Sequence, residues 1–425
     1  MPEGKAVAII GGGWAGLAAA VEATELGHAV TLFDMAPRLG GRARDVQGDA
    51  LLLDNGQHIC IGAYTETLRL MRKVGVPESA AFRRIPLQLI DATGSGLELR
   101  RGPASLAFAQ AVLFHRSWSL REKVGLLAAS ARWFVSEFRC DPALTVSRLT
   151  EGLSPAVRRD LIDPLCVSAL NTHADFASAQ VFLRVLHDAL LSGAGSADLL
   201  LPRMGLGALL PAPAATWLRA AQAKLRLRHR VERIERDADG WSVDGLRFAH
   251  VVLAASSAEA AHLTARIVPE WAARAAALEY APIMTIYMTS AGTVLPRPMI
   301  TLSTDPANPA QFVFDRGQLG GPSGLLAFVV SGAERWVEAG RDATLEAVMH
   351  QAERCLGDLL KAPLVATMLV TEKRATFRCT PGLKRPPMKV APCLTAAGDY
   401  VDGPYPATLE GAVRSGVAAA RAITA

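Results

Sequence analysis

A glycine-rich turn near the N-terminus restricts the fold of this chain more than any other feature. Residues Ala6–Ile10 (AVAII) predict a buried parallel strand, and the turn that follows reads Gly11-Gly12-Gly13-Trp14-Ala15-Gly16, a match to G-x-G-x-x-G. Leu17–Leu26 predicts a helix, and Ala29–Phe33 (AVTLF) predicts a second buried strand that ends at Asp34. This order of strand, glycine turn, helix and strand is typical of a dinucleotide-binding fold.

Each residue type in the turn has a physical role. Gly11 allows the tight turn, Gly13 lets a pyrophosphate approach the backbone closely, and Gly16 lets the helix pack against the strand. The start of the helix, at Trp14 and Ala15, offers unpaired N–H groups and a partial positive charge to the diphosphate. Asp34 lies 21 residues after Gly13, where a carboxylate accepts the ribose hydroxyls and disfavours a 2′-phosphate. These residues alone leave NAD and FAD equally open.

The segment after Asp34 separates the two cofactors. It reads Arg38-Leu39-Gly40-Gly41-Arg42, in which the glycines permit close approach and the arginines offer bidentate hydrogen bonds to phosphate. At this point the sequence resembles the amine oxidase and phytoene desaturase superfamily of flavoproteins. The resemblance implies FAD, with Arg38, Gly40, Gly41 and Arg42 against its pyrophosphate and ribityl chain.

The C-terminal end resembles the second flavin motif of the same superfamily. A predicted strand, Cys393–Ala397, precedes Gly398-Asp399, and residues 403–416 open a final helix that runs to Ile423. The resemblance implies that Gly398 and Asp399 touch the ribityl–phosphate region. It also implies that the helix start, with Ala407, Thr408 and Leu409, points at the isoalloxazine, where a helix N-terminus stabilises negative charge.

The resemblance also implies how the remaining chain is divided. Val231, in a strand predicted over Leu225–Glu235, is expected to contact adenine through its backbone. The expected fold is α/β, with a Rossmann-type FAD domain, a β-sheet substrate domain and a helical subdomain. The expected boundaries are 1–85, 195–265 and 390–425 for the FAD domain, 86–103 and 266–389 for the substrate domain, and 104–194 for the helical, membrane-contacting subdomain.

Composition excludes several classes of protein. The chain is 50% apolar and 20% charged, as expected for a globular protein, and has no apolar run long enough to span a bilayer and no expected signal peptide. Six cysteines lack CxxC or zinc-like spacing, so we expect reduced thiols and no metal site.

The net charge of +5 fits ordinary surface variation or attraction to an anionic membrane; nucleic acid is not expected. The expected location is cytoplasmic, at the inner face of the membrane. Phe114–Trp118 is expected either to pack between helices around a polar turn or to contact lipid.

A finer resemblance rests on Asp54–Tyr64 (DNGQHICIGAY), supported by Leu170-Asn171-Thr172, Leu201–Gly205, Arg374–Phe377 and Gly403–Glu410. Together these segments resemble the squalene-associated, FAD-dependent desaturase-like proteins, the hydroxysqualene dehydroxylases of bacterial hopanoid synthesis. That family implies reductive removal of the allylic hydroxyl of hydroxysqualene. A polyprenoid desaturase, an amine oxidase and a non-catalytic FAD-binding scaffold remain alternatives.

The dehydroxylation needs a proton donor for the departing oxygen, a dry apolar tunnel and groups that stabilise an allylic cation. Candidates are His58, which follows Gly56 and Gln57 in the segment expected near the flavin, Tyr405, and Asn171 as a holder of the substrate hydroxyl. Each residue also has a structural alternative. His58 could hydrogen-bond to the cofactor or the backbone, Tyr405 could pack its ring beside the isoalloxazine, and Asn171 could cap a helix. Cys393 lies before the last motif, so we expect non-covalent FAD. NAD(P)H or a reductase is expected as electron donor, and other squalene or hopanoid enzymes as partners.

Overall fold

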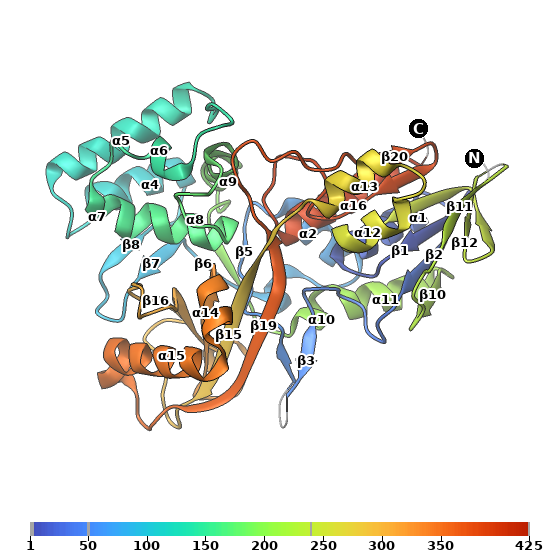
Figure 1. Ribbon diagram of the computed structural model, residues 1–425. Coiled ribbons are helices and arrows are strands. Elements are labelled where there is room, and N and C mark those ends of the chain that lie inside the picture. Colours follow the sequence, from blue (N-terminus) through green and yellow to red (C-terminus); the bar gives the residue numbers. More distant parts are fainter. Residues whose placement is uncertain (1–3, 49–51, 239, 424–425) are drawn as a thin grey trace.

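The largest sheet of the protein is built from strands that lie far apart in the sequence. The computed structural model of the chain describes residues 4–48, 52–238 and 240–423. Its largest sheet has the order β10-β2-β1-β14-β21-β20, in which only β20 is antiparallel to its neighbour. The bounds are β1 Ala6–Ile10, β2 Ala29–Asp34, β10 Lys224–Leu227, β14 His250–Leu253, β20 Lys389–Ala391 and β21 Leu394–Ala396. The N- and C-terminal ends therefore meet in one sheet (Figure 1).

Helices cover this sheet because its strands are apolar on both faces. The helix after the glycine turn, α1 (Trp14–Glu25), packs on the last helix, α16 (Leu409–Arg421). A Cβ atom on Gly416 would lie 2.1 Å from the Ala15 carbonyl oxygen, so glycine sets the close approach of the two helices. The other elements of this lobe are α2 Thr65–Lys73, α3 Glu78–Ala81, α10 Leu206–Leu209, α11 Pro211–Ala220, α12 Ser257–Thr264, α13 Pro269–Ala276 and the meander β11 Ile234–Asp237, β12 Gly240–Val243 and β13 Leu246–Phe248.

A second sheet forms the floor of the other lobe, with the order β16-β17-β18-β15-β19 and antiparallel pairing throughout. Its bounds are β15 Tyr280–Thr289, β16 Met299–Thr301, β17 Phe312–Asp315, β18 Leu325–Ser331 and β19 Val365–Phe377, with α14 Glu334–Ala339 and α15 Arg341–Leu356 beside it. Short strands join the lobes: β3 Asp45–Gln47, β4 Leu52–Asp54, β5 Cys60–Ile61, β6 Phe82–Ile85, β7 Gln88–Ile90, β8 Gly96–Glu98 and β9 Leu199–Pro202.

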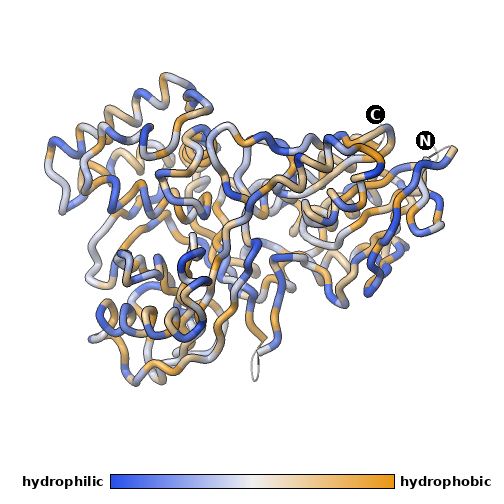
Figure 2. The backbone as a smooth tube through the Cα atoms, in the orientation of Figure 1, coloured by the Kyte–Doolittle hydropathy of each residue, from blue (hydrophilic) through white to orange (hydrophobic). Residues whose placement is uncertain are grey.

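Helices alone make up the third part, between β8 and β9 (Figure 1, upper left). Ser119 caps the longest of them through a reciprocal capping box with Glu122, which fixes where that helix begins. The helices are α4 Ala104–Leu113, α5 Leu120–Val135, α6 Val146–Leu149, α7 Pro155–Val157, α8 Asp163–Leu170 and α9 Ala179–Leu191, with a π-helical turn over Arg158–Ile162. Apolar segments run through this part as well as through the sheets (Figure 2).

Three expected elements differ from the structure. Val231 lies outside any strand: β10 ends at Leu227, Arg228 adopts a left-handed φ of 56°, and the next backbone N–H groups, of Glu232 and Arg233, donate to the Asp244 carboxylate. Cys393 stands in a turn before β21, with a φ of 58°. The last helix begins at Leu409, because Thr408 caps it.

Two carboxyl groups, the buried Asp54 and the half-buried Asp45, lie together where β3 and β4 meet the start of α10. Asp54 accepts a hydrogen bond from the Leu206 N–H at 2.7 Å and Asp45 accepts one from the Gly207 N–H at 2.8 Å. Burial, assisted by the neighbouring Asp45, raises the pKa of Asp54 to about 7. Asp54 is therefore largely protonated in the folded protein at mildly acidic pH.

We expect this pair to make stability depend on pH. The folded state binds the Asp54 proton more tightly than the unfolded state, so the free energy of unfolding should fall as pH rises from about 4 through about 7, by on the order of 3 kcal/mol. Asp54→Asn mimics the protonated form and should remove that fall in urea-unfolding curves measured across this range. The exposed Asp358→Asn is the control. Equal pH slopes for wild type and Asp54→Asn would contradict the prediction.

Candidate cofactor and substrate site

The glycine turn forms a cradle at the carboxyl end of β1. Gly11 has a φ of 109°, and a Cβ atom there would lie 2.5 Å from the Ala254 carbonyl oxygen. A Cβ atom on Gly16 would lie 1.8 Å from the Gly11 carbonyl oxygen, so both positions require glycine. Gly13 differs, because a Cβ atom added there would meet only the Gly41 Cα atom, at 3.8 Å. Gly13 therefore faces open space at the N-terminus of α1, as a pyrophosphate site requires.

The loop after β2 closes over this cradle. Gly40 donates its N–H to the Gly12 carbonyl oxygen at 2.8 Å, and Gly40 and Gly13 form a bridge. Asp34 accepts hydrogen bonds from the Gly12 N–H at 2.6 Å and the Ala36 N–H at 2.7 Å, which hold its carboxylate at the cavity with lone pairs left for ribose hydroxyls. Gly40, Gly41 and Arg42 line the cavity. Arg38 does not: its side chain is exposed, which does not support its expected cofactor contact.

Arg42 joins three distant segments of the chain. It pairs with the buried carboxylate of Asp399 and donates to the Ala375 carbonyl oxygen at 2.8 Å, and its guanidinium carbon lies 5.9 Å from the Tyr280 ring centroid. Gly398, next to Asp399, donates its N–H to the Ser415 hydroxyl at 3.1 Å. The N-terminal loop, β19 and the C-terminal motif are thereby held around one cavity.

The start of α16 points into the same cavity, where Ala407, Thr408 and Leu409 line the wall. Thr408 accepts the Gly411 N–H at 3.0 Å as the helix cap. The following residue of the motif, Glu410, is fully buried and turns away from the cavity to accept the Thr67 N–H at 2.9 Å and its hydroxyl at 2.7 Å. Glu410 thus fixes α16 to α2, a role that the motif in the sequence did not reveal because its partner lies 343 residues away.

Three further residues that were expected at the cofactor lie at the cavity. Val231 is buried and lines the cavity, as does Ala15. Trp14 also lines it, but its indole N–H donates to the Ala43 carbonyl oxygen at 3.0 Å, which ties α1 to the loop over the cradle.

The Gly56–His58 segment lines the cavity beside β15. Gln57 donates its N–H to the Thr285 hydroxyl at 3.4 Å and accepts from the Arg316 guanidinium at 3.0 Å. His58 Nδ1 lies 2.8 Å from the Gly56 carbonyl oxygen, which can only accept, so Nδ1 carries the proton. Burial, together with the positive charge of Arg42, lowers the pKa of His58. A neutral His58 with its proton committed to Gly56 is a poor acid.

Asn171 is a structural residue in this geometry. It has a left-handed φ of 48° and ends α8, and its side-chain oxygen accepts the Gly332 N–H at 2.7 Å. Its side-chain amide donates to the Thr376 hydroxyl at 2.9 Å and to the Ala281 carbonyl oxygen at 3.3 Å. All of its polar atoms are therefore occupied in tying the helical part to the second sheet, which does not support a contact with a substrate hydroxyl.

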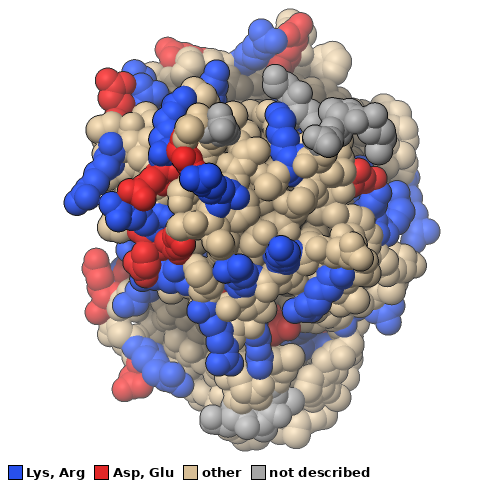
Figure 3. Space-filling model, turned by 90° about the vertical axis from the view of Figure 1, so that its right-hand side faces the viewer, with Lys and Arg blue, Asp and Glu red and all other residues tan. Residues whose placement is uncertain are grey.

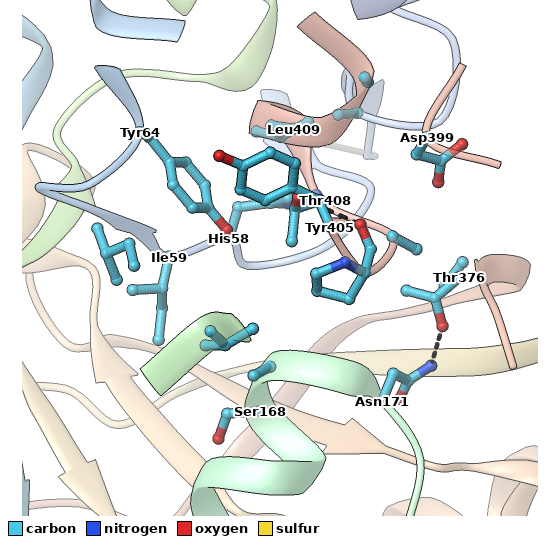
Figure 4. Close-up of a pocket in the computed structure, with 18 of the residues that line it drawn as sticks. His58, Ile59, Tyr64, Ser168, Asn171, Thr376, Asp399, Tyr405, Thr408 and Leu409 are labelled. Atoms are coloured by element: carbon cyan, nitrogen blue, oxygen red, sulfur yellow. Dashed lines mark hydrogen bonds between the residues drawn. The ribbon is translucent and has the colours of Figure 1, made fainter. Parts of the chain in front are cut away.

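Two tyrosines face one another near the start of α16 (Figure 4). The Tyr405 hydroxyl accepts from the Arg184 guanidinium at 3.3 Å, and the guanidinium carbons of Arg184 and Arg414 lie 5.2 and 5.3 Å from its ring centroid. Burial raises the pKa of Tyr405, so the phenol stays protonated at neutral pH. Because Arg184 occupies a lone pair, the hydroxyl proton of Tyr405 remains available for donation. Burial raises the pKa of Tyr64 as well.

One cavity of about 1010 Å³ continues from the cradle into the helical part, and its lining includes Gly13, Asp34, Arg42, His58, Tyr64, Asn171 and Tyr405. Beyond Tyr405 its lining is mainly apolar and includes Leu89, Phe108, Leu127, Trp133, Phe182 and Leu186. The glycine cradle, the placed Asp34 carboxylate and the helix start at Thr408 fit the two ends of an FAD molecule. None of the six cysteines lines the cavity, consistent with a cofactor that is not tethered through sulfur.

No helix in the part of the chain that the structure describes is long and apolar enough to cross a membrane.

Comparison with known proteins agrees with this geometry. Residues 14–424 match the model of a family described as flavin containing amine oxidoreductase. The chain is 26% identical to a hydroxysqualene dehydroxylase of Sinorhizobium fredii, over 98% of this chain and 97% of that protein, and 27% identical to one of Rhodopseudomonas palustris, over 99% of each. The fold is similar to that of an oxidoreductase from Methanosarcina mazei, with a TM-score of 0.73, 16% identity and coverage of 98% and 100%.

Proposed function

The chain belongs to the flavin containing amine oxidoreductase family, and from that premise we propose that it removes the allylic hydroxyl group of hydroxysqualene reductively to give squalene. It is an FAD-dependent oxidoreductase. The observation that carries the proposal is the apolar cavity that runs from the flavin cradle into the helical part with a neutral phenol, Tyr405, at the flavin end. The names of the full-length relatives support the choice of substrate.

The polar groups of the cavity favour a neutral substrate over an amine. An ammonium group would need an unpaired carboxylate or an equivalent acceptor. Each of the carboxylates that line the cavity already has a cation or N–H partner, namely Asp34, Asp188, Glu259, Glu372 and Asp399. The two facing tyrosines alone would also suit an amine oxidase, so the paired carboxylates are the feature that favours a neutral substrate here.

Reduced FAD, when bound, supplies a hydride. The Tyr405 hydroxyl donates a proton to the oxygen of the allylic alcohol, the C–O bond breaks and water leaves, and the carbon would then take the hydride that the reduced cofactor supplies. Arg184, 3.3 Å from the hydroxyl, stabilises the phenolate that remains. The apolar lining keeps bulk water from the allylic cation. Gly13, Asp34 and the start of α16 hold the cofactor, and Arg42 with Asp399 holds the walls together.

The test is an anaerobic single turnover. Photoreduced holoprotein mixed with hydroxysqualene should reoxidise its flavin and yield squalene in equal amount, measured by flavin absorbance and by mass spectrometry of the lipid. Protein with confirmed FAD that leaves hydroxysqualene unchanged would refute the proposal. Oxidised holoprotein mixed with a polyprenoid hydrocarbon or an amine tests the desaturase and oxidase alternatives by flavin bleaching.

A further inference from the structure

We propose that the helical part docks on an anionic lipid bilayer through α5 and the α4–α5 connection, and that the apolar substrate enters the cavity from the bilayer at this face. The inference rests on the proposed function only for the identity of the lipid that enters. Its evidence is an exposed apolar stripe, a local excess of positive charge without ion pairs, and a cavity that opens beside the stripe.

The apolar stripe lies on the solvent side of α5. Leu120, Val124, Ala128, Ala131 and Val135 are spaced by three or four residues, which places them on one face of a helix, and all five are exposed. Val135 is 83% exposed and Leu120 is 74% exposed. A helix on a protein surface normally presents polar residues there. Its opposite face is apolar too, because Leu126, Ala129 and Trp133 are buried in the protein.

Exposed apolar side chains concentrate in this part of the molecule. Of the fourteen exposed large apolar residues among those described, nine fall within residues 104–194, including Phe114 at 71% and Phe134 at 60%. Such concentration marks a binding surface. Trp118, expected from the sequence to lie at a lipid interface, is instead buried and stacks on His115 with ring centroids 3.8 Å apart. Phe114 is the outward-facing aromatic residue of that segment.

The same segment carries the positive charge of the chain. Residues 100–136 contain six Lys and Arg and one Glu. The whole chain has 45 basic and 40 acidic residues, so the remainder is balanced at 39 of each. Among the described residues none of the six forms an ion pair. They are Arg100, Arg101, Arg116, Arg121, Lys123 and Arg132. Unpaired cations beside an apolar helix face complement an anionic lipid surface.

The cavity reaches the surface beside the stripe. Ala131 and Phe134 on α5, and Leu191 at the end of α9, line the cavity and are exposed at the same time. A polyprenoid that left the bilayer at this point would pass from lipid to the apolar lining without crossing water. This continuity favours a bilayer over a protein partner as the occupant of the face.

The opposite end of the molecule provides a control for charge alone. Many Lys and Arg side chains gather on that face, which holds the edge of the main sheet (Figure 3). Arg226 and Arg228 on and beside β10 are exposed there. If positive charge alone drove attachment, this end would bind anionic vesicles as well.

Flotation of the FAD-loaded full chain with vesicles tests the proposal. At about 0.1 M salt the wild type should float with vesicles of equal parts phosphatidylglycerol and phosphatidylcholine. The variant Arg116→Gln/Arg121→Gln/Arg132→Gln removes three cations and should weaken binding by on the order of 100-fold, since each cation contributes about fivefold. The variant Leu120→Ser/Val124→Ser/Val135→Ser removes the apolar stripe and should weaken binding by about tenfold or more. Their matched controls are Lys224→Gln/Arg226→Gln/Arg228→Gln and Leu52→Ser/Val294→Ser/Val365→Ser, all at exposed positions elsewhere.

Both controls should bind like the wild type, and all variants should keep their FAD absorbance. A wild type that stays unbound, a stripe variant that floats normally, or controls that lose binding equally would each overturn the proposal. The stripe variant should also lose turnover of substrate embedded in vesicles while keeping turnover of substrate in detergent micelles. Vesicle binding without any turnover would refute the proposed function and leave this inference standing.

Discussion

Gly13→Asp is expected to yield a folded protein that does not retain FAD. Gly13 is the N-cap of α1, with a φ of −72°, and a Cβ atom there would touch only Gly41 at 3.8 Å. Aspartate is a preferred N-cap residue, so the fold of the apoprotein should be kept or slightly stabilised. Its carboxylate would stand where the cradle receives the diphosphate. Two like charges about 4 Å apart near a protein surface repel by about 4 kcal/mol, which is about 1000-fold in affinity.

Isothermal titration of the apoprotein with FAD measures this loss, and circular dichroism with thermal unfolding measures the fold. Thr145→Asp is the matched control, because Thr145 is the N-cap of α6 and does not line the cavity. It adds the same charge at the same kind of position without touching the cradle. Gly13→Asp protein that purifies with a full complement of FAD would show that the diphosphate lies elsewhere.

Local patterns in the sequence were enough to predict the cradle. Strand, turn, helix and ribose carboxylate lie within residues 6–34, and the hydrogen bonds that place Asp34, to the Gly12 and Ala36 N–H groups, stay within or directly beside that segment. The contact of Gly11 with Ala254 is a long-range one, but the glycine itself was visible in the pattern. The boundaries failed where long-range contacts decide them. Val231 leaves the predicted strand because Asp244, on a different turn, takes the backbone N–H groups of Glu232 and Arg233.

The chemistry of the site was harder to predict for the same reason. The sequence shows that His58, Asn171 and Tyr405 can each donate a proton or a hydrogen bond, but not which of them has a free group. That depends on Gly56 for His58, on Thr376 and Gly332 for Asn171, and on Arg184 for Tyr405. Arg184 comes from α9 and Tyr405 from the C-terminal motif, 221 residues apart. Only the folded chain brings them together.

Tyr405→Phe is expected to reduce the rate of hydroxysqualene reduction by about 100- to 1000-fold, the usual contribution of a positioned proton donor. The phenyl ring keeps the packing between Arg184 and Arg414, so FAD affinity should not change. Because burial raises the pKa of Tyr405 above its ordinary value of 10, the wild-type rate should hold through neutral pH and fall only in more alkaline solution. In Tyr405→Phe the remaining activity should lack this fall in rate in alkaline solution, here called the alkaline limb. Anaerobic stopped-flow reoxidation of the flavin gives both measurements.

Two further variants separate proton donation from packing. Arg184→Gln removes the charge that stabilises the phenolate but leaves the hydroxyl, so its loss of rate should be smaller, about tenfold. Tyr64→Phe deletes the other phenol of the same cavity. If Tyr64→Phe lost as much rate as Tyr405→Phe, or alone lost the alkaline limb, proton donation would belong to Tyr64. If neither variant slowed the reaction, the departing oxygen would take its proton from another source, and the role of Tyr405 would be limited to packing between its two arginines.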